Sequence, residues 1–145
     1  RDFFTAIVNA ISLVRENIHI MQRNQKYIDE LKGNLKILRT EIIDKRIHSV
    51  VVCHGADSHE WDELASQLST EEWIKCSELV YSFVRDTEIE TGKQIPLILS
   101  LFGGYRRDDY NSVLSLHATD LVTCLNILCG RTIDYVSEVK PRNTN

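Results

Sequence analysis

The clearest pattern in this sequence is a run of apolar residues spaced three or four positions apart between Tyr27 and Ile43. This spacing places them along one side of an amphipathic helix, so we predict a helix over these residues. The members of the stripe are Tyr27, Ile28, Leu31, Leu35, Leu38, Ile42 and Ile43. The segment that follows, Ile47 to Cys53, is a short β-branched run (IHSVVVC), which predicts a strand buried on both faces, as in the centre of a parallel sheet.

A second helix and a second strand follow. Ser69 and Glu72 have the spacing of a capping box, in which each side chain accepts a hydrogen bond from the other residue's backbone N–H. We therefore predict a helix that begins there and ends before the polar loop RDTEIETGK around Gly92. Its inner stripe consists of Trp73, Cys76, Val80, Phe83 and Val84. The apolar run from Ile95 to Phe102 predicts the next strand, with Pro96 near its start, where the missing N–H is tolerated.

A third helix is expected after the glycine pair that ends this strand. Asp108 or Asp109 can cap its start, and Gly130 is a candidate left-handed terminator. The apolar side carries Val113, Leu116, His117, Leu121, Cys124 and Leu128. We expect His117 to be a satisfied core histidine and the residues after Arg131 to be a loose end.

The order of these elements predicts the fold class. The stretch from Ile7 to Leu13 fits a strand, although it can equally begin a helix. With a strand there, strands and helices alternate, which predicts an α/β fold with a parallel sheet and helices on both faces. In such sheets the loops after the carboxyl ends of the strands converge on a binding site. Because Asp57 and His59 follow one strand and Tyr105 follows the other, we expect these three side chains to face one crevice.

The composition fits one globular domain and narrows the classes of function. The 145 residues are 43% hydrophobic and 26% charged, enough for a real core. The net charge of -4 at pH 7 argues against a general binder of nucleic acids or anionic membranes. No apolar run approaches the roughly 18 residues that span a bilayer. The four cysteines lack CxxC spacing, which predicts free thiols in a reducing, intracellular compartment.

Several stretches of the chain resemble a known family. The segments GADSHEWDELASQLSTEEW and IPLILSLFGGYRRDDYNSVLSLHATDL resemble the second half of the zinc-dependent histone and lysine deacetylases, closest to class IV and the bacterial acetoin-utilisation-like branch. The earlier segments RDFFTAIVNAISLVREN and QKYIDELKGNLKIL are similar to the parts of the family that precede these loops. The resemblance implies that residues 1–130 form about half of an arginase/deacetylase-like three-layer domain, followed by a tail at 131–145.

The resemblance also implies a chemistry. In that family an Asp-x-His pair and the aspartate of Gly-x-Asp, here Asp57, hold a zinc ion that polarises an acetyl-lysine amide. The tyrosine after the glycine turn, here Tyr105, stabilises the oxyanion. Gly103 and Gly104 let that turn approach the substrate, and His59 belongs to the same substrate-facing region. This sequence departs from the family because it contains no Asp-x-His pair and lacks the catalytic histidines.

Each of these residues also has a simpler interpretation. Asp57 is a common turn and helix-cap residue, and Tyr105 can simply pack the turn. His54 and His59 can be surface residues rather than ligands. The Arg106–Asp109 cluster is either a solvated cap or a rim that faces a partner.

Three hypotheses of function follow. We expect a degenerate histone deacetylase-like subunit, non-catalytic by itself, with a structural or interaction role in a larger assembly, because one aspartate cannot hold zinc with useful affinity. The alternative is the C-terminal part of an active zinc-dependent lysine deacetylase, completed by a missing N-terminal half, with zinc as cofactor and acetyl-lysine as substrate. A third hypothesis is a module that binds a small molecule or acyl group without chemistry. For the isolated chain we expect no cofactor, no nucleic acid, no membrane, and an obligate protein partner that covers the open sheet edge.

Overall fold

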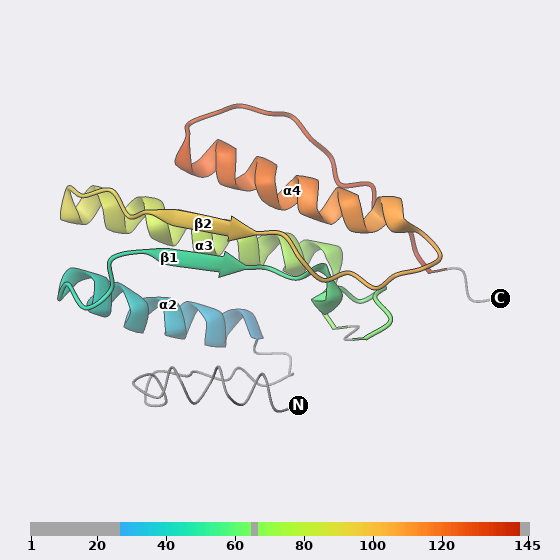
Figure 1. Cartoon of the computed structure of the whole chain (residues 1–145), viewed down its shortest axis with the longest axis horizontal. Helices are drawn as coiled ribbons and strands as arrows, with labels where there is room; N and C mark the ends of the chain where they lie inside the picture. The colour runs from blue at the N-terminus through green and yellow to red at the C-terminus, as the bar shows by residue number, and fades with distance from the viewer. Residues whose placement is uncertain (1–26, 65–66, 143–145) are drawn as a thin grey trace.

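A computed structural model of the chain describes residues 27–64 and 67–142 (Figure 1). In this part of the chain, helices and strands alternate along the sequence. The elements are α2 (Tyr27–Ile43), β1 (Val50–Cys53), the short 3-10 helix η2 (Ala56–Ser58), α3 (Thr70–Thr91), β2 (Leu97–Ser100) and α4 (Tyr110–Leu128). The strand predicted at Ile7 to Leu13 lies outside the described residues.

The two described strands form a parallel sheet. Their register pairs Val50 with Leu97 at one end and Cys53 with Ser100 at the other. A parallel pair needs a long crossover between its strands, and α3 supplies it here. The fold is therefore α/β with a parallel sheet, as the alternation of elements predicts.

The three described helices pack on the same face of this sheet. The paired residues Val50 and Leu97 contact a core to which all three helices contribute, through Leu38, Ile42, Phe83, Val84 and Leu128. The next pair, Val51 and Ile98, points to the opposite face because side chains alternate along a strand, and these two are 58% and 59% exposed. The prediction that the first strand is buried on both faces is wrong for these residues, and within the described chain no helix lies against the second face.

The helix boundaries follow the predicted capping residues. Ser69 caps α3: its Oγ accepts a hydrogen bond from the Glu72 N–H at 3.2 Å, and the Glu72 carboxylate accepts one from the Ser69 N–H at 2.9 Å. The helix ends at Gly92, which adopts the left-handed conformation at φ 63°. Asp109, rather than Asp108, caps α4 by accepting a hydrogen bond from the Ser112 N–H. The predicted caps at Ser69 and Asp109 are confirmed. The predicted end of α3 is wrong, because the helix continues through RDTEIET, the segment expected to be a loop, as far as Thr91.

The segment after α4 is attached to that helix. Figure 1 shows residues after the end of α4 running back along it. The Glu138 N–H donates to Ser115 Oγ at 2.7 Å, and the Lys140 N–H donates to Ser112 Oγ at 3.0 Å. Both serines are buried on α4, so they hold the returning segment along the helix. The prediction of a loose end is therefore wrong for residues 131–142.

Candidate functional site

The loops that follow β1 and β2 are joined into one unit at the carboxyl ends of the strands. The Ala56 N–H donates to the carbonyl oxygen of Phe102 at 3.3 Å. The Tyr105 N–H donates to Asp62 Oδ2 at 2.6 Å, while Asp62 Oδ1 accepts from the Leu64 N–H at 2.9 Å. Asp62 is only 3% exposed, so this carboxylate is part of the loop scaffold. The predicted convergence of the two loops is confirmed, although Asp62 was not expected to be the link.

Asp57 occupies the narrow space between the two loops. A Cβ atom added to Gly103 would lie 2.5 Å from Asp57 Oδ1 and 3.3 Å from the Cα of Gly55, and one added to Gly55 would overlap the same carboxylate. Gly103 and Gly104 also have φ values of +71° and +92°, a conformation that side chains disfavour. This turn therefore requires glycine for two reasons: the Asp57 carboxylate lies where a Cβ atom would be, and the backbone has positive φ values.

The two residues to which the resemblance assigns chemistry have no polar partner in the described chain. Asp57 is half-buried, and among residues 27–64 and 67–142 its carboxylate has no hydrogen bond. The side chain of Tyr105 is exposed, and its hydroxyl likewise has no hydrogen bond to a described residue. A zinc site requires three or more ligands, and the described residues contain no group of three metal-binding side chains. This part of the chain by itself therefore does not fit a zinc ion.

His59 turns away from the expected crevice and into the protein. It is 2% exposed, with Nε2 2.9 Å from Thr70 Oγ1 and Nδ1 accepting a hydrogen bond from the Trp61 N–H. Because Nδ1 accepts, the ring proton of the neutral histidine is on Nε2 and is donated to Thr70. Burial, with a smaller contribution from the charge of Arg106, lowers the pKa of His59 to about 4. The interpretation of His59 as a surface residue is wrong, and in this arrangement His59 holds the loop rather than facing a substrate.

His54 belongs to a buried polar network that the sequence did not indicate. Its ring stacks on Trp73 with 3.9 Å between ring centroids, and its Nδ1 lies 3.4 Å from Asp120 Oδ1. The same oxygen accepts hydrogen bonds from Ser77 Oγ at 2.6 Å and from the Tyr81 hydroxyl at 3.0 Å. Asp120 is fully buried, and its Oδ2 has no hydrogen-bond partner among the described residues. The network joins the end of β1 to α3 and α4.

The charges in this network are set by its hydrogen bonds. Burial acts to raise the pKa of Asp120, but hydrogen bonds from His54, Ser77 and Tyr81 outweigh it and lower the pKa below its ordinary value. Burial, together with the nearby Asp120 carboxylate, raises the pKa of Tyr81. In a hydrolytic triad the serine and the aspartate contact opposite ring nitrogens of the histidine, whereas here both lie at Nδ1 of His54. The geometry is that of a structural link and not of an activated serine.

Arg106 is buried and connects the glycine turn to the C-terminal segment. Its side chain is 4% exposed and forms a two-pronged ion pair with Asp108, with distances of 2.8 and 3.0 Å. The same guanidinium donates to the carbonyl oxygens of Lys140 and Pro141. The interpretation of this cluster as a solvated cap is thus wrong for Arg106, whereas Arg107 is exposed.

His117, the histidine predicted to be a satisfied core residue, is only half-buried. His117 lies on α4, and its Nδ1 is enclosed without a hydrogen-bond partner in the described chain. The prediction of a satisfied core residue is therefore wrong for this ring nitrogen.

No family model, curated protein or solved structure matches this chain. The fold and the two joined loops define a small α/β domain with a parallel sheet and a polar site at its carboxyl edge. Within the described residues, no helix has the length and apolar character needed to cross a bilayer.

Proposed function

We propose that this chain is a deacetylase-like subunit, non-catalytic by itself, that binds a protein partner through the open face of its sheet. The observation that carries the proposal is the exposure of apolar side chains on and beside that face. Val51 and Ile98 are 58% and 59% exposed, and Leu101 and Phe102, directly after β2, are each 48% exposed. Single soluble chains rarely leave a contiguous apolar surface uncovered, so a surface of this kind marks an interaction site.

The edges of the sheet support the same proposal. Among the described residues the sheet has only two strands, so each strand has one edge without a paired neighbour. Unpaired backbone N–H and C=O groups favour the addition of another strand or coverage by a partner. The expected partner is a polypeptide with an apolar surface, consistent with the half-domain that the resemblance implies.

The non-catalytic part of the proposal rests on the side chains available for metal binding. Asp57 is the one predicted ligand whose side chain has no polar partner in the described chain, while His59 is buried and hydrogen-bonded at both ring nitrogens. A zinc amidohydrolase needs at least two further ligands, and these would have to come from outside the described residues. An intracellular location remains a prediction from the cysteines, all of which are free thiols.

The partner surface can be tested by replacing one apolar residue at a time with lysine. We expect the wild-type chain alone to self-associate in sedimentation velocity, and Val51→Lys and Ile98→Lys to shift it towards the monomer. Ile89→Lys is the matched control, because Ile89 is 74% exposed on α3, and it should leave association unchanged. A wild-type chain that is a cooperative, well-behaved monomer would contradict the proposal.

The alternative is the C-terminal part of an active zinc-dependent lysine deacetylase that acts on acetyl-lysine. It is favoured by one observation, the position of Asp57 against Gly103, which agrees with the relationship between the two loops that the resemblance implies. The discriminating experiment is metal analysis of the native complex. Stoichiometric zinc that is lost in Asp57→Ala but kept in Asp86→Ala would select the active enzyme, and a complex without zinc would select the non-catalytic subunit.

A further inference from the structure

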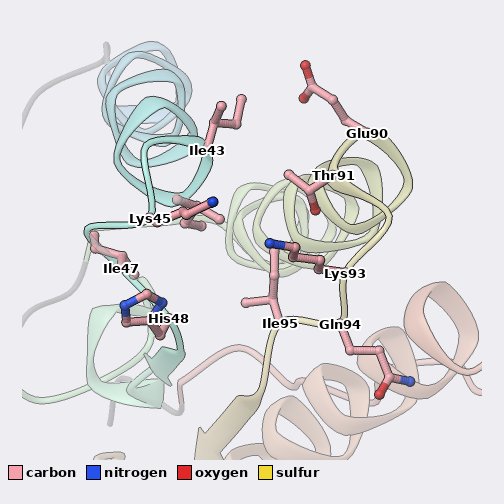
Figure 2. Close-up of a pocket in the computed structure, with 10 residues that line it drawn as sticks. Ile43, Lys45, Ile47, His48, Glu90, Thr91, Lys93, Gln94 and Ile95 are labelled. Carbon is pink, nitrogen blue, oxygen red and sulfur yellow. The ribbon is translucent and has the colours of Figure 1, made fainter.

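A pocket lies at the other end of the sheet, where the strands begin (Figure 2). It is formed by the last turns of α2 and α3 and by the segments that lead into β1 and β2, and its volume is about 390 Å³. Small-molecule sites in proteins commonly occupy about 300–1,000 Å³. The size of the pocket therefore fits a small ligand, and its position separates it from both Asp57 and the open face of the sheet.

The apolar wall of the pocket comes from four isoleucines, Ile42, Ile43, Ile47 and Ile95. Two of them, Ile42 and Ile95, are buried and belong to the same core cluster as Val84, so this wall is part of the folded core. Ile43 is 42% exposed, which leaves apolar surface at the mouth of the pocket. A ligand with an apolar body would cover that surface.

Two lysines supply the positive charge of the pocket. Figure 2 shows the ammonium groups of Lys45 and Lys93 directed towards each other across the space between the ends of α2 and α3. Within the described residues neither lysine has an ion pair or a side-chain hydrogen bond. The acidic residue at the rim, Glu90, is neutralised by Arg39, whose Nε donates to its carboxylate at 2.6 Å. Within the described residues the two ammonium groups therefore have no carboxylate partner, whereas the rim carboxylate already has one.

The ammonium group of Lys45 is not needed to satisfy the end of α2, because backbone N–H groups, that of Lys45 included, do so. The carbonyl oxygens of the last turn accept backbone N–H groups of the following residues, at 2.9 Å for Thr40 and Glu41 and 3.0 Å for Ile42. Lys45 itself has φ 62°, the left-handed conformation that non-glycine residues rarely adopt. The turn therefore fixes the backbone of Lys45 while leaving its ammonium group available to a ligand.

We propose that this pocket binds a small molecule with an apolar body and one anionic head group, a carboxylate or a phosphate. The isoleucines contact the body, and Lys45 and Lys93 bind the head group. Burial of the apolar body supplies most of the affinity, and the two ammonium groups select anions over neutral molecules of the same size. The proposal is independent of the partner-binding function, because the pocket and the open face share no residue.

Methyl NMR of the full chain with labelled isoleucines tests the proposal, because isoleucines lie both inside and outside the pocket. Sodium octanoate, octyl phosphate and octanol are the probes. We expect octanoate or octyl phosphate to shift the methyl signals of Ile42, Ile43, Ile47 and Ile95 and to leave Ile98 on the open face unchanged. The tighter of the two anions identifies the head group, and octanol should bind at least about tenfold more weakly.

Variants of the two lysines provide the second readout. Lys45→Asn removes the charge with a residue that tolerates the left-handed conformation, and Lys93→Gln removes the other charge. Each should weaken anion binding about tenfold without changing the binding of octanol. Lys75→Gln is the matched control on α3, where Lys75 pairs with Glu78 away from the pocket, and it should bind as the wild type does. Shifts centred on Ile98, no shift at millimolar probe, or equal anion binding in the lysine variants would overturn the proposal.

Discussion

The carboxylate of Asp57 packs against the backbone of Gly103, so the side chain that follows the first strand is positioned by the shape of the loop that follows the second. The contact leaves no room for even a methyl group between them. The position of the Asp57 carboxylate at the carboxyl edge of the sheet therefore depends on the conformation of both loops.

Replacement of this glycine should destabilise the fold. In Gly103→Ala the added Cβ would meet Asp57 Oδ1 at 2.5 Å, and alanine is also strained at φ +71°. We expect a loss of about 1–3 kcal/mol in the free energy of unfolding, measured by urea denaturation. Gly33→Ala is the matched control, because Gly33 lies within α2 with nothing near its missing Cβ, and there the same change should stabilise the chain by about 0.5–1 kcal/mol. Equal effects at the two positions would contradict this account of the glycine turn.

The buried His59 should make stability depend on pH. Its pKa falls from 6.5 to about 4 on folding, so between these values the unfolded chain binds more protons than the folded one. Stability should therefore decrease as the pH is lowered from 6.5 to 4, by roughly 3 kcal/mol from this residue, with no further loss below pH 4. The measurement is the free energy of unfolding across this range for the wild type and His59→Gln, and the decrease should be smaller in the variant. Identical pH profiles would show that His59 is not the titrating group.

Removal of the Asp120 carboxylate should be costly, because it leaves the hydroxyl groups of Ser77 and Tyr81 without their acceptor in the core. We expect Asp120→Ala to reduce the free energy of unfolding by about 3 kcal/mol or more, and Tyr81→Phe by about 1–2 kcal/mol. Asp86→Ala on the exposed side of α3 should change it by less than about 0.5 kcal/mol. Thermal and urea unfolding of the three variants would measure these differences, and an Asp120 variant as stable as the Asp86 variant would exclude a structural role for the network.

The attachment of the C-terminal segment can be measured by amide hydrogen exchange. The N–H groups of Glu138 and Lys140 donate to buried serines, so they should exchange about tenfold or more slowly than the exposed amide of Val136. Arg106→Ala should remove this protection, because it deletes the guanidinium that binds the Lys140 and Pro141 carbonyls. Arg107→Ala serves as the control, since its side chain is 90% exposed. Unprotected amides in the wild type would show that the segment is not held in solution.

The features that the sequence predicted well are those with local signals. Helix α2 has the predicted bounds, because an amphipathic stripe repeats over several turns. The caps at Ser69 and Asp109, which start α3 and α4, depend on residues within three or four positions of each other. The end of α3 was predicted too early, because the polar composition of RDTEIET indicated a loop where the helix continues. The two strands were found where expected but are shorter. The predicted runs extend beyond the paired residues, at the start of β1 and at both ends of β2.

The features that the sequence missed depend on contacts between distant residues. His54 and Asp120 are 66 positions apart, and no spacing rule links the end of a strand to the middle of a helix. The link between Asp62 and the Tyr105 N–H spans 43 positions. The one sequence signal for this network was a polar residue, Asp120, on the inward side of a predicted helix. Such a residue indicates a buried polar contact but does not show which residues form it. The exposure of Val51 was missed because an apolar run alone does not indicate which faces of the sheet are covered.

The alternation of side chains along β1 links two properties of this domain. Val50 and Val52 lie towards the helices, Val51 and Cys53 lie towards the open face, and the next inward position is His54. A one-residue insertion in this strand would exchange these directions, exposing Val50, which now packs against the core formed with the helices, and separating the imidazole from Asp120. Substitution of an exposed residue of β1, such as Val51, therefore leaves the core in place. A change in the length of β1 would disturb the exposed surface and the core together.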